Sequence, residues 1–419
     1  MKKKPRILLY SHDTYGLGHL RRSLSIAEQI ASDIPNVHQL LLTGSMVAGA
    51  FALPPRLDMI KLPAISKRST GQYKTRTLPL TLKQTLAWRE QIILQAAVNF
   101  KPDLLLVDKV AAGVHGELLP TLRHLKTWFP QTKVVLGMRD IEDSPAKTKQ
   151  EWLEKGTYAL LDDVYDQILF YGQCQMFNPV TAYEMSDTAA SKLIECGYIR
   201  REKTSRTPDA VRRELGIGDK PLVVVTVGGG GDGFNILKNM LDMLAAWQTA
   251  VSFHTLLVTG PLMPRTKQQN LHKQAGTLAD VTLIDFTPDL TSYLNTSDLI
   301  ISMAGYNTTC EILSMQKRAI LIPRARVRAE QRIRATHLAK LGIISSLLPD
   351  QLTPDTLWQS IQTALQTPPP THTLNMNGLS YISRTVAALL NNALAPHANG
   401  HIHIPAILSP KTQPQEVSL

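Results

Sequence analysis

The stretch LVVVTVGGGGDG, residues 222–233, joins an apolar run to a glycine-rich turn, and an amphipathic segment follows it. A buried strand, a glycine turn and a helix in this order indicate an open α/β sheet. Glycine lets the main chain approach a ligand closely, and a helix N-terminus supplies N–H donors with a partial positive charge. We therefore predict a phosphate-binding turn at Gly228, Gly229, Gly230 and Gly231, with a turn that binds nothing as the alternative. The turn lacks the Lys-Ser/Thr pair of nucleotide hydrolases, which argues against an ATPase or GTPase.

The same alternation of apolar runs and amphipathic segments extends to both sides of this stretch. Strands are predicted at residues 7–11, 37–42, 58–62, 103–107, 133–138 and 167–171, and again at residues 222–227, 254–259, 281–286, 299–303, 320–323 and 343–347. Two helical faces are predicted between them, one with Leu20, Leu24 and Ala27 and one with Leu82, Leu86, Ile93 and Ala97. Strands that alternate with helices indicate parallel, doubly wound sheets.

The length of 419 residues exceeds what one hydrophobic core usually supports, so we predict two domains. A basic, polar segment at residues 197–220 separates the two sets of strands. The predicted fold class is α/β, with Rossmann-like domains at residues 1–205 and 206–372 facing each other across a cleft. Three consecutive prolines, at residues 368–370, end the second unit. A further helix is predicted at residues 373–396 and a disordered tail at residues 397–419.

The formal net charge of +11 favours anionic partners such as phosphates, lipid headgroups or nucleic acid, without choosing among them. The three cysteines are far apart and show no spacing typical of disulfides or structural zinc, so no metal site is predicted. The basic start of the chain leads into an apolar run too short for a signal sequence, and no stretch is long and apolar enough to span a membrane. We therefore expect a cytoplasmic protein.

A second predicted helix start, AGYNTTCE at residues 304–311, follows the strand at residues 299–303. Gly305 opens this turn, and Asn307 and Thr308 can cap the helix or contact an anion. Glu311 lies between two apolar residues one turn later, where its carboxylate can accept hydrogen bonds from a ribose diol. Capping alone explains the Asn and Thr, and a solvated helix face is the alternative for Glu311.

A third segment at residues 320–334 ends a strand in Pro323 and opens a helix that is rich in arginine. Arginines here can hold diphosphate oxygens through forked hydrogen bonds. The pair Glu330 and Gln331 offers the acceptor and the mixed donor and acceptor groups that sugar hydroxyls require. We predict sugar contacts at these two residues, against the alternative of a solvated basic helix.

The predicted N-terminal strand leads into the turn HDTYGLGH, residues 12–19, and then into a helix. Gly16 and Gly18 shape this turn. His19 is the candidate general base, because histidine titrates in the useful range, and Asp13 is predicted either to act as the base or to orient His19. A histidine that only caps the helix is the alternative. Arg139 and Asp140 follow another strand at its carboxyl end and are predicted to form part of an acceptor wall.

The three C-terminal segments, in this order, resemble the donor-binding domain of GT-B glycosyltransferases, and specifically of family 28. This family includes the UDP-N-acetylglucosamine transferase of peptidoglycan lipid-precursor synthesis. The resemblance implies that a glycine-rich turn and a Gly-x-x-Thr-x-x-Glu helix start hold the nucleotide, and that a Pro-rich strand end with a His-Gln or Asp-Gln pair holds the sugar. The matching residues are Gly228, Gly229, Gly230 and Gly231, then Gly305, Thr308 and Glu311, then Pro323 and Gln331. Glu330 replaces the family's His or Asp, which leaves the donor sugar open.

The resemblance implies an enzyme that moves a sugar from a UDP-linked donor to an unknown acceptor with inversion, and that requires no metal or cofactor. A UDP-N-acetylglucosamine 2-epimerase-like enzyme and a non-catalytic nucleotide-sugar-binding protein are the alternatives. The implied domain roles are acceptor side for residues 1–205 and donor side for residues 206–372.

Residues 61–89 contain seven basic residues and no acidic residue. The basic residues are Lys61, Lys67, Arg68, Lys74, Arg76, Lys83 and Arg89. This segment could rest on an anionic membrane, as a peripheral protein at the inner face of the cell membrane, or admit a lipid-linked or phosphorylated acceptor. An exposed basic loop and helix face is the alternative. No nucleic-acid partner is predicted, since no binding module or aromatic stacking set lies nearby.

Overall fold

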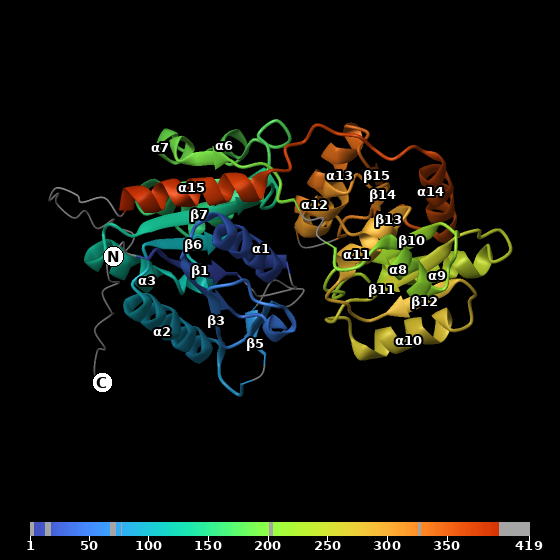
Figure 1. Cartoon of the computed structure of the whole chain (residues 1–419), viewed down its shortest axis with the longest axis horizontal. Coiled ribbons are helices and arrows are strands. Elements are labelled where there is room, and N and C mark those ends of the chain that lie inside the picture. Colours follow the sequence, from blue (N-terminus) through green and yellow to red (C-terminus); the bar gives the residue numbers. More distant parts are fainter. Residues whose placement is uncertain are drawn as a thin grey trace, which may run out of the picture.

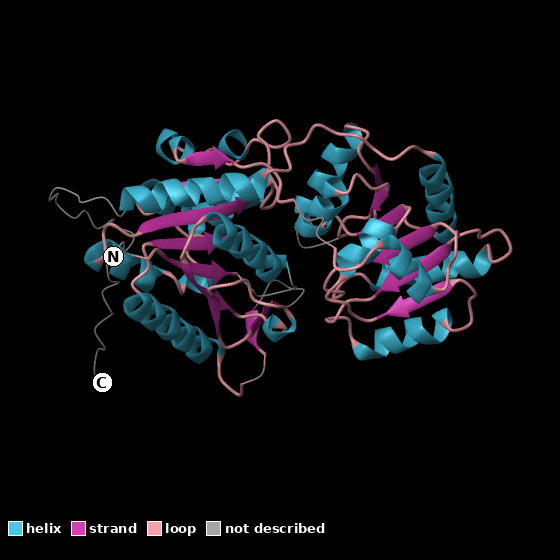
Figure 2. Ribbon diagram, in the orientation of Figure 1, coloured by secondary structure: helices cyan, strands magenta, loops and turns pink. Residues whose placement is uncertain are grey.

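The computed structural model describes residues 4–12, 18–67, 73–76, 78–200, 204–325 and 328–393, and they form two α/β domains (Figures 1 and 2). The first domain contains a parallel seven-stranded sheet in the order β3-β2-β1-β6-β7-β8-β9. Its strands are β1 (Arg6–Ser11), β2 (His38–Thr43), β3 (Leu57–Lys61), β6 (Leu104–Asp108), β7 (Lys133–Arg139), β8 (Gln167–Tyr171) and β9 (Leu193–Glu195). A separate antiparallel hairpin pairs β4 (Ile65–Lys67) with β5 (Tyr73–Thr75).

Helices cover both faces of the first sheet. The helices of this domain are α1 (Gly18–Asp33), α2 (Leu82–Phe100), α3 (Leu119–Trp128), α4 (Pro145–Glu154), α5 (Thr157–Asp163), α6 (Pro179–Ala182) and α7 (Asp187–Ser191). Apolar residues of α1 pack with one set of strand side chains, and those of α2, α3 and α5 pack with the opposite set. The alternation of inward side chains along β1 produces this division, since successive residues of a strand face opposite sides of the sheet.

The second domain contains a parallel six-stranded sheet in the order β12-β11-β10-β13-β14-β15. Its strands are β10 (Leu222–Thr226), β11 (His254–Val258), β12 (Val281–Ile284), β13 (Leu299–Ser302), β14 (Ala319–Leu321) and β15 (Ser345–Ser346). Its helices are α8 (Pro208–Leu215), α9 (Phe234–Ala246), α10 (Arg265–Ala275), α11 (Leu290–Thr296), α12 (Tyr306–Ser314), α13 (Glu330–Lys340) and α14 (Pro354–Gln366). All five residues of β10 are buried, as expected for a central strand covered by helices on both faces.

The chain returns to the first domain at its C-terminal end. Helix α15 (Gly378–Ala393) packs against α1 and β7, and Figure 1 shows it lying along the first domain. Just before this helix, Ile199 and Asn377 form a β-bridge, so the two segments that connect the domains lie side by side. The predicted boundary at residues 205 and 206 falls between the two sheets, and the predicted tail at residues 397–419 lies outside the described residues.

Two details of the first domain correct the sequence predictions. Leu82 and Leu86 are only half-buried on α2, and the buried face includes Thr85 and Arg89. Arg89 therefore does not belong to an exposed basic surface. Its guanidinium donates two hydrogen bonds of 2.6 Å to the carboxylate of Glu117, deep in the domain.

The rest of the predicted basic segment is described in part. Lys61, Lys74, Arg76 and Lys83 are exposed, while Arg68 lies outside the described residues. No helix in the described part of the chain combines the length and apolar character that a membrane span needs.

Candidate active site

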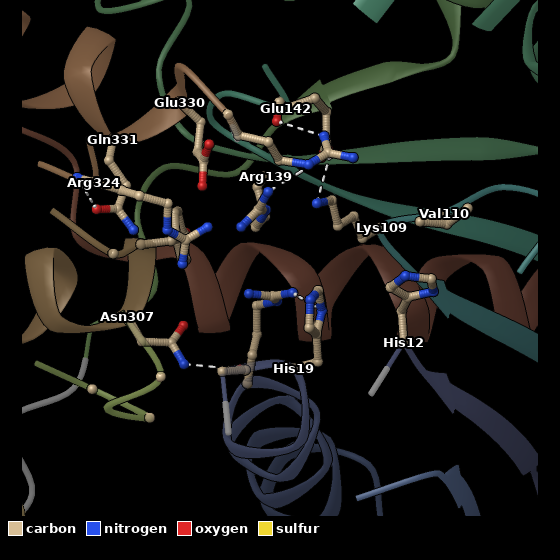
Figure 3. A pocket seen from close by; sticks show the side chains of 18 of the residues that line it. His12, His19, Lys109, Val110, Arg139, Glu142, Asn307, Arg324, Glu330 and Gln331 are labelled. Atoms are coloured by element: carbon tan, nitrogen blue, oxygen red, sulfur yellow. Dashed lines mark hydrogen bonds and ion pairs between the residues drawn. The ribbon is translucent and has the colours of Figure 1, made fainter. Parts of the chain in front are cut away.

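A cavity of about 1870 Å³ lies between the two domains and is lined by residues of both (Figure 3). In the first sheet β1 lies between β2 and β6, and in the second β10 lies between β11 and β13. The strand order therefore reverses beside β1 and beside β10. In open α/β sheets, ligands bind outside the carboxyl ends of the strands at such a reversal. The residues that follow β1, β6, β10 and β13 line this cavity.

The glycine turn after β10 forms part of the cavity wall through Gly228, Gly229, Gly230 and Gly231. Gly228 and Gly230 have φ angles of 62° and 87°, in the left-handed region that glycine adopts readily. A Cβ on Gly230 would lie 2.1 Å from the carbonyl oxygen of Thr259, so a larger residue cannot fit without moving the backbone. Helix α9 begins at Phe234, three residues after the last of these glycines.

Helix α12 places its first turn at the cavity. Gly305 is the N-cap residue, and Asn307 and Thr308 line the cavity with it. The amide of Asn307 donates a hydrogen bond of 2.8 Å to the carbonyl oxygen of Gly18 in the other domain. These residues lie where the sequence predicted, although their contacts with a ligand stay predictions.

Glu311 departs from its expected place. Its side chain is fully buried and is not among the residues that line the cavity. Arg21 of α1 donates a hydrogen bond of 2.7 Å to its carboxylate. One oxygen of the carboxylate that was predicted to receive a ribose diol is therefore engaged by an arginine of the opposite domain.

The start of α13 brings Glu330 and Gln331 to the cavity, and both side chains are buried. Gln331 Oε1 accepts a hydrogen bond of 2.9 Å from the backbone N–H of Arg324, which holds the loop before the helix. Glu330 Oε2 has no hydrogen-bond partner among the described residues. The Arg324 guanidinium lies 2.5 Å from the carboxylate of Asp232, which connects this loop to the glycine turn.

His19 faces the cavity from the first turn of α1 and contacts Asp108, the last residue of β6. The ring Nδ1 lies 2.5 Å from Asp108 Oδ2, and Arg22 donates hydrogen bonds of 2.6 and 2.9 Å to Asp108 Oδ1. Since the ionised Asp108 can only accept a hydrogen bond, Nδ1 of the neutral ring carries the proton and Nε2 keeps its lone pair. This arrangement suits a general base, because the carboxylate orients the ring and stabilises its protonated form.

The electrostatics of this pair support the same assignment. Burial lowers the pKa of His19 below its usual value, and the Asp108 carboxylate offsets part of that effect. Burial opposes ionisation of Asp108, but Arg22 and His19 outweigh it and hold the pKa of this carboxyl far below its usual range. At neutral pH the imidazole is therefore neutral and the aspartate is charged.

The acceptor-side predictions have mixed outcomes. Gly18 and Arg139 line the cavity. Asp140 does not, and its predicted place in an acceptor wall is corrected: it is 2% exposed and binds Arg334 through hydrogen bonds of 2.6 and 2.7 Å. Asp13 and Gly16 lie outside the described residues.

Sequence reasoning missed two residues here: Lys109 lines the cavity, and the buried Asp108 contacts His19. The signal was available, because a charged pair ends an otherwise apolar run at residues 104–107. Charged residues at the carboxyl end of a buried parallel strand point to a ligand site. Within the described residues, no three His, Cys, Asp or Glu side chains gather in a way that could hold a metal ion.

Comparisons with known proteins agree with this geometry. Residues 223–380 match the model of the glycosyltransferase family 28 C-terminal domain. The UDP-N-acetylglucosamine--N-acetylmuramyl-(pentapeptide) pyrophosphoryl-undecaprenol N-acetylglucosamine transferase of Acetivibrio thermocellus is 24% identical over 364 residues, which cover 83% of this chain and 87% of that protein.

Two solved structures share the fold over most of their length. MurG of Acinetobacter baumannii has a TM-score of 0.52 at 15% identity, covering 93% of this chain and 100% of that one. The UDP-GlcNAc 2-epimerase of Methanocaldococcus jannaschii has a TM-score of 0.59 at 11% identity, with the same coverage. The chain is therefore a glycosyltransferase with the GT-B fold, and its residues 223–380 are similar to the C-terminal domain of glycosyltransferase family 28.

Proposed function

We propose that this protein transfers a sugar from a UDP-linked donor to an acceptor hydroxyl with inversion at the anomeric carbon. One observation carries the proposal: a single cavity joins the glycine turn and Glu330 of the second domain to His19 and its partner Asp108 in the first. The name of the Acetivibrio thermocellus transferase gives UDP-N-acetylglucosamine as its donor, which supports a UDP-linked donor here.

The donor is proposed to bind on the second domain. Backbone N–H groups of the glycine turn and the guanidinium of Arg324 would hold the diphosphate, as such groups do at other phosphate sites. Glu330 and Gln331 would bind the sugar hydroxyls. Glu311 would receive the ribose once Arg21 has released it.

In the proposed step, His19 accepts the proton of the acceptor hydroxyl while the hydroxyl oxygen forms a bond to the anomeric carbon. The bond between that carbon and the β-phosphate oxygen breaks, and its electron pair leaves with UDP. Asp108 stabilises the imidazolium that results. Arg324 and the N–H groups of the turn stabilise the negative charge on the leaving diphosphate, so the proposal needs no cofactor.

The acceptor is proposed to be lipid-linked, and the protein to work as a peripheral protein at the inner face of the cell membrane. The name of the Acetivibrio thermocellus transferase gives a pyrophosphoryl-undecaprenol acceptor for that protein, which is the support for a lipid-linked acceptor here. Lys61, Lys74, Arg76 and Lys83 are exposed and offer a basic surface of this chain. Sedimentation with phosphatidylserine vesicles should fall as salt rises, and binding that ignores salt would contradict the proposal.

The test of the proposed function compares His19→Ala with His38→Ala, a change at an exposed histidine far along the sheet. With UDP-N-acetylglucosamine and a membrane lipid extract as acceptor, His19→Ala should lose at least about 100-fold in sugar incorporation while its UDP affinity stays within about twofold. His38→Ala should match the wild type. Undiminished transfer by His19→Ala would contradict the assigned base.

The same assay separates the two other functions. An epimerase-like enzyme would convert UDP-N-acetylglucosamine into its C2 epimer without any lipid, whereas the wild-type chain is expected to require the lipid extract for turnover. A non-catalytic binding protein would bind UDP with no incorporation under any condition.

A further inference from the structure

Two cations on the cavity wall share a single carboxylate. Lys109 follows β6, and its Nζ lies 3.4 Å from Glu142 Oε2. Arg139 ends β7, and its guanidinium lies 3.8 Å from the same oxygen. Figure 3 shows both side chains pointing into the cavity below Glu142, with Glu330 of the second domain nearby. Both side chains are nearly buried, so solvent screens their repulsion poorly.

The guanidinium of Arg139 has unused donors. The terminal nitrogen that faces Glu142 lies 3.8 Å from it, too far for a hydrogen bond, so this nitrogen and Nε have no hydrogen-bond partner among the described residues, and both atoms are shielded from solvent. Buried polar groups in folded proteins almost always have partners, so an exception on a cavity wall points to a missing ligand. A guanidinium presents its donors in a fork that matches the oxygens of a carboxylate or phosphate.

A third cation adds to the positive field without being available itself. Arg328 lies 3.6 Å from the carboxylate of Asp143 and 3.5 Å from that of Glu151, so it already has two partners. Lys109 and Arg139 carry two positive charges and share the single carboxylate of Glu142 as ion-pair partner, while the charge of Glu330 also acts on Lys109.

The backbone of Lys109 is held in an unfavourable conformation. Its φ of 73° lies in the left-handed region, which a side chain with a Cβ rarely adopts. A hydrogen bond of 2.8 Å from its N–H to the carbonyl oxygen of Gly137 keeps it there. Burial, followed by the charge of Arg139, lowers the pKa of Lys109 to about 7. Strain and a destabilised charge in one residue are typical of a site that a ligand completes.

The position of the pair favours the acceptor over the donor. Lys109 is adjacent in the chain to Asp108, the partner of the proposed base, and its charge contributes to lowering the pKa of His19. The donor diphosphate already has the glycine turn and Arg324 on the opposite domain. We propose that Lys109 and Arg139 form an oxyanion subsite that binds a phosphate or carboxylate group of the acceptor; this rests on the proposed function.

The test uses inorganic phosphate as the probe, titrated into the full chain by calorimetry in the presence of saturating UDP, which fills the donor diphosphate site. Lys109→Met and Arg139→Gln should each weaken phosphate binding at least about tenfold, since each removes one of two charges that face the anion. Lys155→Met is the matched control, because Lys155 lies at the cavity rim and is 54% exposed. It should change phosphate affinity less than about twofold.

Three results would overturn the proposal. The first is wild-type phosphate affinity in both variants, or no phosphate binding at all, while UDP still binds. The second is loss of UDP binding in Lys109→Met and Arg139→Gln, which would assign these cations to the donor diphosphate. The third is a selective loss of UDP-glucuronate affinity relative to UDP-glucose in Lys109→Met, which would place the anion on the donor sugar.

Failure of the proposed function looks different. If UDP does not bind the wild-type chain, the donor site itself is wrong, and the acceptor assignment fails with it. Unchanged UDP affinity in the two variants, together with weakened phosphate binding, supports the subsite.

Discussion

Replacing Asp108 with Asn tests whether one carboxylate supports both the chemistry and the stability of the first domain. In the wild-type chain this carboxylate accepts hydrogen bonds from His19 and from Arg22. Asn keeps the size of the side chain but removes the charge, and its amide group can face the imidazole. The histidine would then hold its proton on the wrong nitrogen for accepting one from a hydroxyl.

Two magnitudes follow from these contacts. The loss of an oriented general base is expected to lower sugar transfer about 10²- to 10⁴-fold. The side chain of Arg22 is only 3% exposed, so it would be left buried without its counter-ion. Removing one partner of a buried ion pair typically lowers the free energy of unfolding by about 3–5 kcal/mol. The Asn amide oxygen can still accept a hydrogen bond from Arg22, so we expect Asp108→Asn to cost about 3 kcal/mol.

The pH dependence gives a second readout of the same change. Burial lowers the pKa of His19, while the Asp108 charge raises it, so wild-type transfer should fall as the pH drops through a value below 6.5. Asp108→Asn removes the charge and should move this fall to still lower pH. The stabilisation by Asp108 itself is fully present above about pH 4, the unfolded carboxyl value, and is lost only as the pH falls through its lowered folded pKa.

The assay is sugar transfer from pH 5 to 8 together with urea unfolding at pH 7, with the exposed Asp58→Asn as the matched control. The control should behave as the wild type in both measurements. Full transfer activity in Asp108→Asn, or an acid fall that moves to higher pH, would refute the assigned role of the carboxylate.

Two further predictions concern contacts between the domains. Arg334→Met leaves Asp140 buried without its partner and should lower the free energy of unfolding by about 3–5 kcal/mol in urea; a loss under about 1 kcal/mol would contradict a stabilising buried pair. Arg21→Met releases the carboxylate of Glu311 and should tighten UDP binding about three- to tenfold by calorimetry, because a charge-assisted hydrogen bond no longer competes with the ribose. Weaker UDP binding in Arg21→Met would contradict the claim that Arg21 competes with the ribose for Glu311.

The central strands and the turns that follow them could be predicted from sequence, because buried parallel strands are unbroken apolar runs. Residues 222–226 illustrate this, since every one of them is buried. The missed strands β4, β5 and β9 have three residues each, and so short a segment carries no measurable periodicity. The prediction for the buried face of α2 was wrong for another reason. A helical pattern along α2 cannot show that Arg89 pairs with the buried carboxylate of Glu117.

The candidate site was predictable on the donor side and less so elsewhere. The glycine turn and Glu330 could be predicted because their residue types are typical of ligand sites near strand ends, and both line the cavity. The partners of His19 and Glu311 are 89 and 290 positions away in the chain, so their pairing depends on how strands and domains dock. Local sequence pointed to Asp13, which lies outside the described residues, and it could not show that the sheet order brings Asp108 to His19.

Binding of nucleotide sugars to the cavity is the most direct test of the central claim. We predict that UDP-N-acetylglucosamine or another UDP-linked sugar raises the melting temperature of the wild-type chain, because a ligand of the folded state alone stabilises it. Gly230→Ala should abolish that rise, since its Cβ would lie 2.1 Å from a backbone oxygen, while Gly49→Ala, where nothing lies within 4 Å, should keep it. No response of the wild-type chain to any UDP-, GDP- or dTDP-linked sugar, or an equal response in Gly230→Ala, would contradict the account.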